Sequence, residues 1–187
     1  MIIGLCGAAG SGKDTTANIL KNYLTSVEIL AFAKPLKDAA KILFNFTEEQ
    51  LHDPISKEVV DSRWNKSPRE IFQWLGTQVL RNQIDKDFFI KHMEQRINQS
   101  DKDTIIITDI RFDNEAELIK NLGGIIIKII RPNATTTKHN NHETEQGITM
   151  SLVDEIILNN HNTLEELSNK VILTVNKWHK TELSEND

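Results

Sequence analysis

The sequence predicts an α/β fold built on a buried parallel sheet, and two stretches support this prediction. The apolar run Ile2–Cys6 is followed directly by a glycine-rich turn and then by a helical pattern. Within Asp103–Arg111, a short β-branched run ends in Asp109, as is typical of a strand buried on both faces of a parallel sheet. Apolar strands that alternate with helical segments indicate an α/β architecture.

The turn after the first strand, Gly7–Lys13, matches the pattern G-x-x-x-x-G-K. Its glycines let the backbone curl with N–H groups pointing inward, and a helix N-terminus favours anions, so the pattern predicts a phosphate site. Lys13 adds a mobile cation for the outer phosphates of a nucleotide. The alternative is a glycine-rich turn that only links two elements. The position of this turn between a strand and a helix argues against that alternative.

The residue after the loop lysine departs from the usual pattern, which has Ser or Thr there. Asp14 occupies this position and Thr15 follows it. Because one helical step rotates a side chain by about 100°, the pattern alone does not place Thr15 on a magnesium ion. We expect the segment that binds the nucleotide to consist of Gly10, Ser11, Gly12, Lys13, Asp14, Thr15 and Thr16.

Length and composition indicate one globular domain. The chain has 187 residues and a formal net charge of −5, which argues against nucleic acid as the main partner. One cysteine, Cys6, excludes an intramolecular disulfide and favours a reducing cytoplasm, where Cys6 would be a small core residue. No apolar run is long enough to span a bilayer, and the N-terminus is a strand and not a signal peptide.

Apolar periodicity and capping residues predict the remaining elements. We expect helices over Thr15–Leu24, from Pro35, from Ser67, over Lys86–Asn98, over Asn114–Leu122 and from Thr163, and strands over Val27–Phe32, Ile125–Ile130 and Glu155–Leu158. Thr47 and Gln50 suit a small capped turn. Leu43 and Leu164 are expected on buried helix faces, and 179–187 as a frayed polar tail.

Two long polar stretches are predicted to be loops. Asp53–Lys66 is weakly periodic and suits either a mobile loop over a site or a plain surface loop. Asn133–Gly147 suits a lid. Within it, His139, His142, Glu143 and Glu145 match no compact zinc spacing, so we reject a metal site there.

Several cations and one aromatic residue stand where a second anion could bind. Lys34 and Lys37 begin a helix directly after a strand, where they either meet an anion or are solvated. Gly76 interrupts a helical pattern and admits a close neighbour, either another helix or a ligand. Trp74 is expected to pack in the core, with a role as a platform for a base as the alternative.

Asp109 and Arg111 are placed for chemistry, because ligands of open α/β sheets lie at the carboxyl ends of strands. A strand-terminal Asp beside a phosphate loop commonly organises Mg²⁺. The alternative is an Asp that caps the next helix. Thr15 and Asp109 are therefore the candidate Mg²⁺ ligands.

Five segments, in this order, resemble the phage deoxynucleoside monophosphate kinases. They are Ser11–Ala17, Pro35–Ala39, Leu75–Thr77, Thr108–Arg111 with Arg131–Pro132 downstream, and His142–Glu145. That family shares Asp14 after the loop lysine. The chain lacks the long insertion that some relatives carry between the Pro35 helix and the Gly76 helix. Base preference and oligomer contacts therefore stay open.

The resemblance implies a three-layer P-loop kinase core, with five parallel strands and helices on both faces. It also implies transfer of the γ-phosphate of ATP to a deoxynucleoside monophosphate (dNMP), with Mg²⁺. Lys13 would hold ATP, and Asp109 would orient Mg²⁺ or the acceptor. Lys37, Arg69 and Arg111 would grip the acceptor phosphate. Trp74, Gly76 and Thr77 would lie near the nucleoside, and Arg131 would close over ATP.

The expected organisation is a single domain over 1–187, with a mobile acceptor-side region at about 47–100 and a lid at about 131–147. The expected partners are ATP and a dNMP, without nucleic acid or membrane, in the cytoplasm of a host if the chain comes from a phage. A monomer and a homodimer both stay open. Competing functions are a small P-loop kinase for another phosphate or a coenzyme precursor, a non-catalytic nucleotide switch and, less in keeping with the acidic charge, a nucleic-acid-repair kinase.

Overall fold

The computed structural model describes residues 1–132, 147–160 and 163–184, with side chains described as far as Trp178. In chain order the elements are β1 (Ile2–Cys6), α1 (Lys13–Tyr23), β2 (Val27–Leu30), α2 (Lys34–Phe44), α3 (Glu48–His52), η1 (Ser56–Glu58), α4 (Pro68–Gln73), η2 (Trp74–Ile84), α5 (Phe88–Gln99), β3 (Thr104–Ile110), α6 (Asp113–Asn121), β4 (Ile125–Ile130), η4 (Met150–Leu152), β5 (Glu155–Leu158) and α7 (Leu164–Ser184). Each expected strand and helix has a counterpart here. None of the described helices could cross a membrane.

The strands form one parallel sheet of five strands, in the order β2-β3-β1-β4-β5. The central strand β1 pairs with β3 through Ile3 and Ile106, and with β4 through Ile3 and Ile125. The predicted parallel sheet is therefore confirmed. This order brings the end of β1, where the glycine-rich turn begins, beside the end of β3, which carries Asp109.

The described chain divides into two compact units. The first combines Met1–Ala31 with Arg96–Asp187 and contains the sheet. The second, Phe32–Gln95, contains α2, α3, α4 and η2. It covers much of the range expected for the acceptor-side region. The single-domain organisation and the mobility of that region stay predictions.

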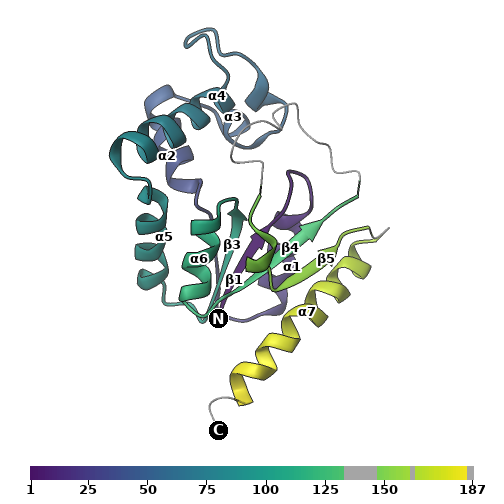
Figure 1. The fold of residues 1–187 in the computed structure, drawn as a ribbon. Helices are drawn as coiled ribbons and strands as arrows, with labels where there is room; N and C mark the ends of the chain where they lie inside the picture. The colour runs from purple at the N-terminus through teal and green to yellow at the C-terminus, as the bar shows by residue number, and fades with distance from the viewer. Residues whose placement is uncertain (133–146, 161–162, 185–187) are drawn as a thin grey trace. The chain divides into compact units, whose positions relative to one another are not determined.

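In the first unit, helices cover both faces of the sheet (Figure 1). On one face α1 and α7 pack over the central strands through Leu20 and Val171, which contact the layer that includes Ile3. On the other face α6 buries Ile119. There a Cβ on Gly124 would lie 2.6 Å from the Ile119 side chain, so the glycine permits this close approach.

Three predictions about helix faces and ends are wrong. Leu43 is 63% exposed, because Phe44 and Phe46 fill the core at that end of α2. Leu164 is 64% exposed, since the buried stripe of α7 begins only at Leu167. The last helix also continues to Ser184, so the expected frayed tail is helical over most of its length.

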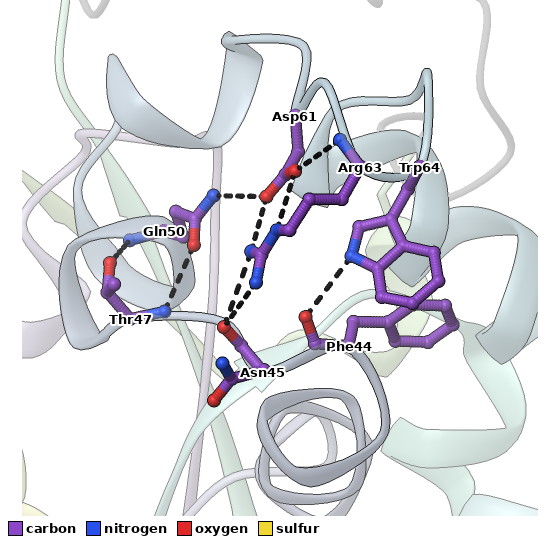
Figure 2. A network of polar contacts seen from close by, with 7 residues as sticks. All are labelled: Phe44, Asn45, Thr47, Gln50, Asp61, Arg63 and Trp64. Carbon is purple, nitrogen blue, oxygen red and sulfur yellow. Dashed lines mark hydrogen bonds and ion pairs between the residues drawn. The ribbon is translucent and has the colours of Figure 1, made fainter.

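In the second unit, the stretch predicted as a loop, Asp53–Lys66, is fastened by a buried carboxylate (Figure 2). The side chain of Asp61 accepts hydrogen bonds from the Arg63 guanidinium at 2.6 and 2.9 Å and from the Gln50 amide at 3.0 Å. Gln50 also closes the predicted capping box with Thr47, which is confirmed. The carboxylate thus ties the stretch to α3.

The same stretch donates hydrogen bonds to the carbonyl groups at the C-terminal end of α2. The Trp64 indole N–H donates to the Phe44 carbonyl at 3.2 Å, and the Arg63 guanidinium donates to the Asn45 carbonyl at 3.4 Å (Figure 2). The Trp64 ring also meets the Phe44 ring edge to face, with centroids 5.3 Å apart. These carbonyls have no partner inside the helix, so the later segment supplies the missing donors.

We predict that Asp61→Asn lowers thermal stability at neutral pH in a pH-dependent way. The Arg63 side-chain hydrogen bonds hold the pKa of Asp61 well below its usual range. A depressed carboxyl pKa stabilises the folded state above the unfolded value of about 4, and this contribution is lost as the pH falls toward the folded value. The difference in Tm between wild type and variant should therefore hold down to about pH 5 and narrow below about pH 4. Thermal scans at fixed ionic strength measure it.

The matched control is Glu94→Gln, at an exposed position of α5 in the same unit. It should change Tm little at neutral pH. Equal Tm values for Asp61→Asn and wild type at pH 7 would contradict the stabilising role of Asp61.

Candidate functional site

The glycine-rich turn is a curled loop that only glycine tolerates at its ends. Gly7, Gly10 and Gly12 have φ values of +141°, +72° and +106°. A Cβ on Gly7 would lie 2.3 Å from the Ile129 carbonyl oxygen, and one on Gly12 would lie 2.5 Å from Asn159 Nδ2. No described side chain caps the start of α1, where Gly12 is the N-cap residue. The loop therefore presents the positive end of a helix, as the sequence predicts.

Lys13 lies over its own loop. Its ammonium donates hydrogen bonds to the carbonyls of Gly7 at 2.8 Å and Ala8 at 2.9 Å. Burial lowers the pKa of Lys13, as does Arg111, while the carboxylates of Asp14 and Asp109 act in the opposite direction. The structure thus brings these four charged residues into one electrostatic group.

Asp109 and Arg111 reach this group because β3 pairs with β1, with Ile110 opposite Cys6. The helix that follows β3 is capped by another residue: the Glu115 carboxylate accepts hydrogen bonds from the backbone N–H groups of Arg111 at 2.8 Å and Phe112 at 3.3 Å. The described bonds therefore give the capping role to Glu115. Asp109 as an orienting carboxylate stays a prediction.

Two hydroxyls at the loop are buried without a hydrogen-bond partner among the described residues. They are Ser11 Oγ and Thr16 Oγ1, in residues with 1% and 0% exposure. Asp14 and Thr15, by contrast, are exposed. Buried polar groups are normally satisfied, so these orphaned hydroxyls fit a loop that binds a polar ligand.

The described residues contain no group of three or more His, Cys, Asp or Glu side chains that could hold a metal ion. A Mg²⁺ ion bound here would take much of its shell from phosphate oxygens and water, as Mg²⁺ does in kinase sites. Asp109 and Thr15 carry oxygen atoms that fit that arrangement, and their role as ligands stays a prediction.

Apart from Arg131, the other predicted site residues lie in the second unit. Arg69 in α4 is 18% exposed in its side chain and forms an ion pair with Glu58 of η1. Gly76 is buried, and a Cβ there would lie 3.0 Å from the Leu36 side chain, so its close neighbour is α2. Trp74 is 45% exposed, which contradicts its expected place in the core. Thr77 is half-buried.

Trp74, Gly76 and Thr77 share an uncommon helical winding. The helix that begins at Pro68 continues as the π-helix η2 over 11 residues. The predicted start of this helix is confirmed: Ser67 and Glu70 form a capping box, and Pro68 stands in the first turn. π-Helical turns are frequent at functional sites.

The start of α2 lies in a cationic neighbourhood within the second unit. Burial lowers the pKa of His52, and Lys37, Lys57 and Lys34 add to the effect while Glu48 opposes it. Lys34 also pairs with Asp38 at 2.8 Å. Lys34, Lys37 and Lys57 therefore share one region with His52, and anion binding by Lys37 stays a prediction.

The predicted lid falls mostly outside the described residues. Arg131 is exposed directly after β4. His139, His142, Glu143 and Glu145 belong to 133–146, outside the described ranges. Past this segment, Thr149 binds the Asp113 carboxylate through its backbone N–H at 2.7 Å and its hydroxyl at 2.6 Å.

Sequence reasoning missed three residues that shape these groups. Glu58, Glu115 and Asn159 each act through contacts with another element or with a helix start. Glu115 carried a usable signal, since an acidic residue in the first turn of a helix is a common partner for its N–H groups. Glu58 and Asn159 carried none, because a single polar residue outside a periodic pattern gives no signal.

Comparisons with known proteins agree on one family. A model of the family described as deoxynucleotide monophosphate kinase matches residues 45–171. A protein named putative deoxynucleotide monophosphate kinase, from Acanthamoeba polyphaga mimivirus, is 36% identical over 94% of this chain and 96% of its own length. The deoxynucleoside-5'-monophosphate kinase of Escherichia phage T5 is 22% identical over 91% and 94%.

Among solved structures, TT1252 from Thermus thermophilus matches with a TM-score of 0.55. It shares 14% identity over 94% of this chain and 95% of that chain. At that identity the likeness supports the fold alone. The glycine loop lies before the residues that the family model matches.

We predict that Cys6 does not react with alkylating reagents in the folded protein. Burial raises the pKa of this thiol to about 11, although Lys128 and Lys13 oppose the shift, so the thiolate is scarce at pH 8. Iodoacetamide labelling followed by mass spectrometry should find the native protein unmodified. The same protein in guanidinium chloride should be fully labelled. Rapid native labelling would show an accessible, activated thiol instead.

Proposed function

The chain belongs to the deoxynucleotide monophosphate kinase family, and on that premise we propose that it transfers the γ-phosphoryl group of ATP to a deoxynucleoside 5′-monophosphate. The products are ADP and the deoxynucleoside diphosphate. The observation that carries the proposal is the loop Gly7–Lys13, in which three glycines have positive φ values and the lysine interacts electrostatically with Asp109 and Arg111. The family match over 45–171 supports the choice of acceptor.

On the donor side, we assign ATP to the loop. The backbone N–H groups at the start of α1 and the ammonium of Lys13 would hold its phosphates, with Gly10, Ser11, Gly12, Asp14, Thr15 and Thr16 lining the same turn. The buried hydroxyls of Ser11 and Thr16 favour a polar ligand here. Mg²⁺, when bound with ATP, would neutralise phosphate charge, and Asp109 and Thr15 are the residues proposed to help hold it.

On the acceptor side, we assign the monophosphate to cations that the sequence singled out. Arg69 and Lys37 belong to the second unit, and Arg111 follows β3 in the first. Arg69 is already held by a carboxylate, that of Glu58, which makes the same charge-assisted contact that a phosphate would make. A guanidinium that is already oriented by a carboxylate is suited to binding an anionic phosphate.

These assignments match what the reaction demands of a protein. Phosphoryl transfer needs little covalent help; it needs two mutually repelling anions held in line with their charge neutralised. The chain has a formal net charge of −5, yet Lys13, Lys37, Arg69 and Arg111 stand at the ends of elements. We further propose that Arg131 contacts ATP and that the segment after it excludes water, a competing acceptor.

Trp74, Gly76 and Thr77 are proposed to lie near the nucleoside, with the exposed Trp74 ring available for stacking. We also propose small-molecule partners only, in the cytoplasm of a host cell if the chain is viral like the relatives described above. Monomer and homodimer both stay compatible with the sequence.

The direct test is ADP release from ATP with each common deoxy- and ribonucleoside monophosphate. We expect at least one deoxynucleotide to stimulate release well above the acceptor-free rate. Lys13→Ala should lower kcat by at least about a hundredfold, because it removes a charge that contacts the transferring group. Lys21→Ala, an exposed lysine in the last turn of α1, serves as the control. No stimulation by any monophosphate would favour the non-catalytic switch.

A second test separates the acceptor phosphate from the donor. Arg69→Ala should raise KM for the deoxynucleotide by about tenfold or more and leave KM for ATP unchanged, since a charged hydrogen bond to phosphate is lost. Glu58→Gln breaks the same ion pair but keeps the guanidinium. It should therefore leave the acceptor KM the same or lower. Equal weakening of both substrates by Arg69→Ala would contradict the assignment.

A further inference from the structure

Asn159 follows β5 and contacts the loop of the first unit from outside. Its side-chain amide Nδ2 donates a hydrogen bond to the Ser11 carbonyl at 2.8 Å. Its own backbone N–H donates to the carbonyl of Ile130, the last residue of β4, at 2.7 Å. The residue is thus fixed by the sheet and reaches across to the loop with one directed bond.

The same amide lies against Gly12. A Cβ built on Gly12 would stand 2.5 Å from Asn159 Nδ2, closer than real Cβ contacts come. At the other end of the loop, a Cβ on Gly7 would stand 2.3 Å from the Ile129 carbonyl oxygen of β4. Gly7 and Gly12 therefore lie close to groups at the carboxyl ends of β4 and β5, and these groups support the loop.

The bond to the Ser11 carbonyl also determines where the next N–H points. In a trans peptide the carbonyl and the following N–H point in opposite directions within one plane. Because the Ser11 carbonyl points toward Asn159, the Gly12 N–H of the same peptide points away from it. Without a partner for the carbonyl, this peptide could rotate, since glycine at Gly12 permits many backbone conformations.

We propose that Asn159 is a positioning residue that holds the Ser11–Gly12 peptide in the orientation that binds the phosphates of ATP. This inference rests on the proposed function, which assigns ATP to this loop. Asn159 itself needs no contact with the nucleotide. Its role is to fix one donor of the loop before the ligand arrives, so that ordering this peptide does not weaken binding.

The test is Asn159→Leu, which keeps the branched shape of the side chain but removes its donor. The Kd for ATP in excess Mg²⁺, measured by isothermal titration calorimetry, should rise about tenfold, the usual effect of losing one hydrogen bond to a part-buried carbonyl. KM for ATP should rise in step, while KM for the deoxynucleotide and kcat at saturating ATP stay close to wild type. The matched control, Asn169→Leu at an exposed position of α7, should change none of these.

Other outcomes separate the possible failures. An unchanged Kd for ATP in a folded Asn159→Leu protein would overturn the inference and leave the proposed function standing. A wild type that does not bind ATP would overturn the proposed function itself. A merely structural residue would lower Tm and the activity toward both substrates alike, which also counts against positioning. Should Asn159→Leu not fold, Asn159→Ala removes the same donor without added apolar bulk and is expected to give the same selective loss.

Discussion

The loop Gly7–Lys13 depends on one constraint: its backbone must pass through conformations that glycine alone adopts readily, in space bounded by the sheet. Gly7 and Gly12 have positive φ values, and Gly7 also has no room for a Cβ, because the Ile129 carbonyl oxygen stands too close. At Gly7, conformation and close packing thus demand glycine independently. The order of the sheet supplies the supports, since β1 has β4 beside it and β5 lies next to β4.

Much of the fold could be predicted because its signals are local. Strands such as Ile2–Cys6 and Glu155–Leu158 have the expected bounds, since short, mostly apolar runs mark them. The caps at Thr47 and Ser67 were likewise readable from a few adjacent residues. The predicted burial of Leu43 was wrong, because periodicity shows only which residues share a helix face. Neighbouring elements decide whether that face is covered.

The candidate site was predictable where charge and position coincide and not where one side chain bridges distant segments. Lys13, Asp109 and Arg111 form a group because pairing of β1 with β3 brings two strand ends together. The bond from Asn159 to Ser11 spans 148 positions, and no local pattern announces it. Asp61 and Arg63 likewise hold the expected loop Asp53–Lys66 in place, because they form hydrogen bonds with Gln50 and Asn45 (Figure 2). No local pattern predicts these bonds.

The resting place of Lys13 has an energetic consequence. Its ammonium has already exchanged part of its hydration shell for the carbonyls of Gly7 and Ala8. The dehydration of a cation, a large cost in most anion complexes, is therefore partly met when the chain folds. In the proposed ATP complex, the ammonium would exchange these neutral carbonyls for charged phosphate oxygens without first giving up a full hydration shell.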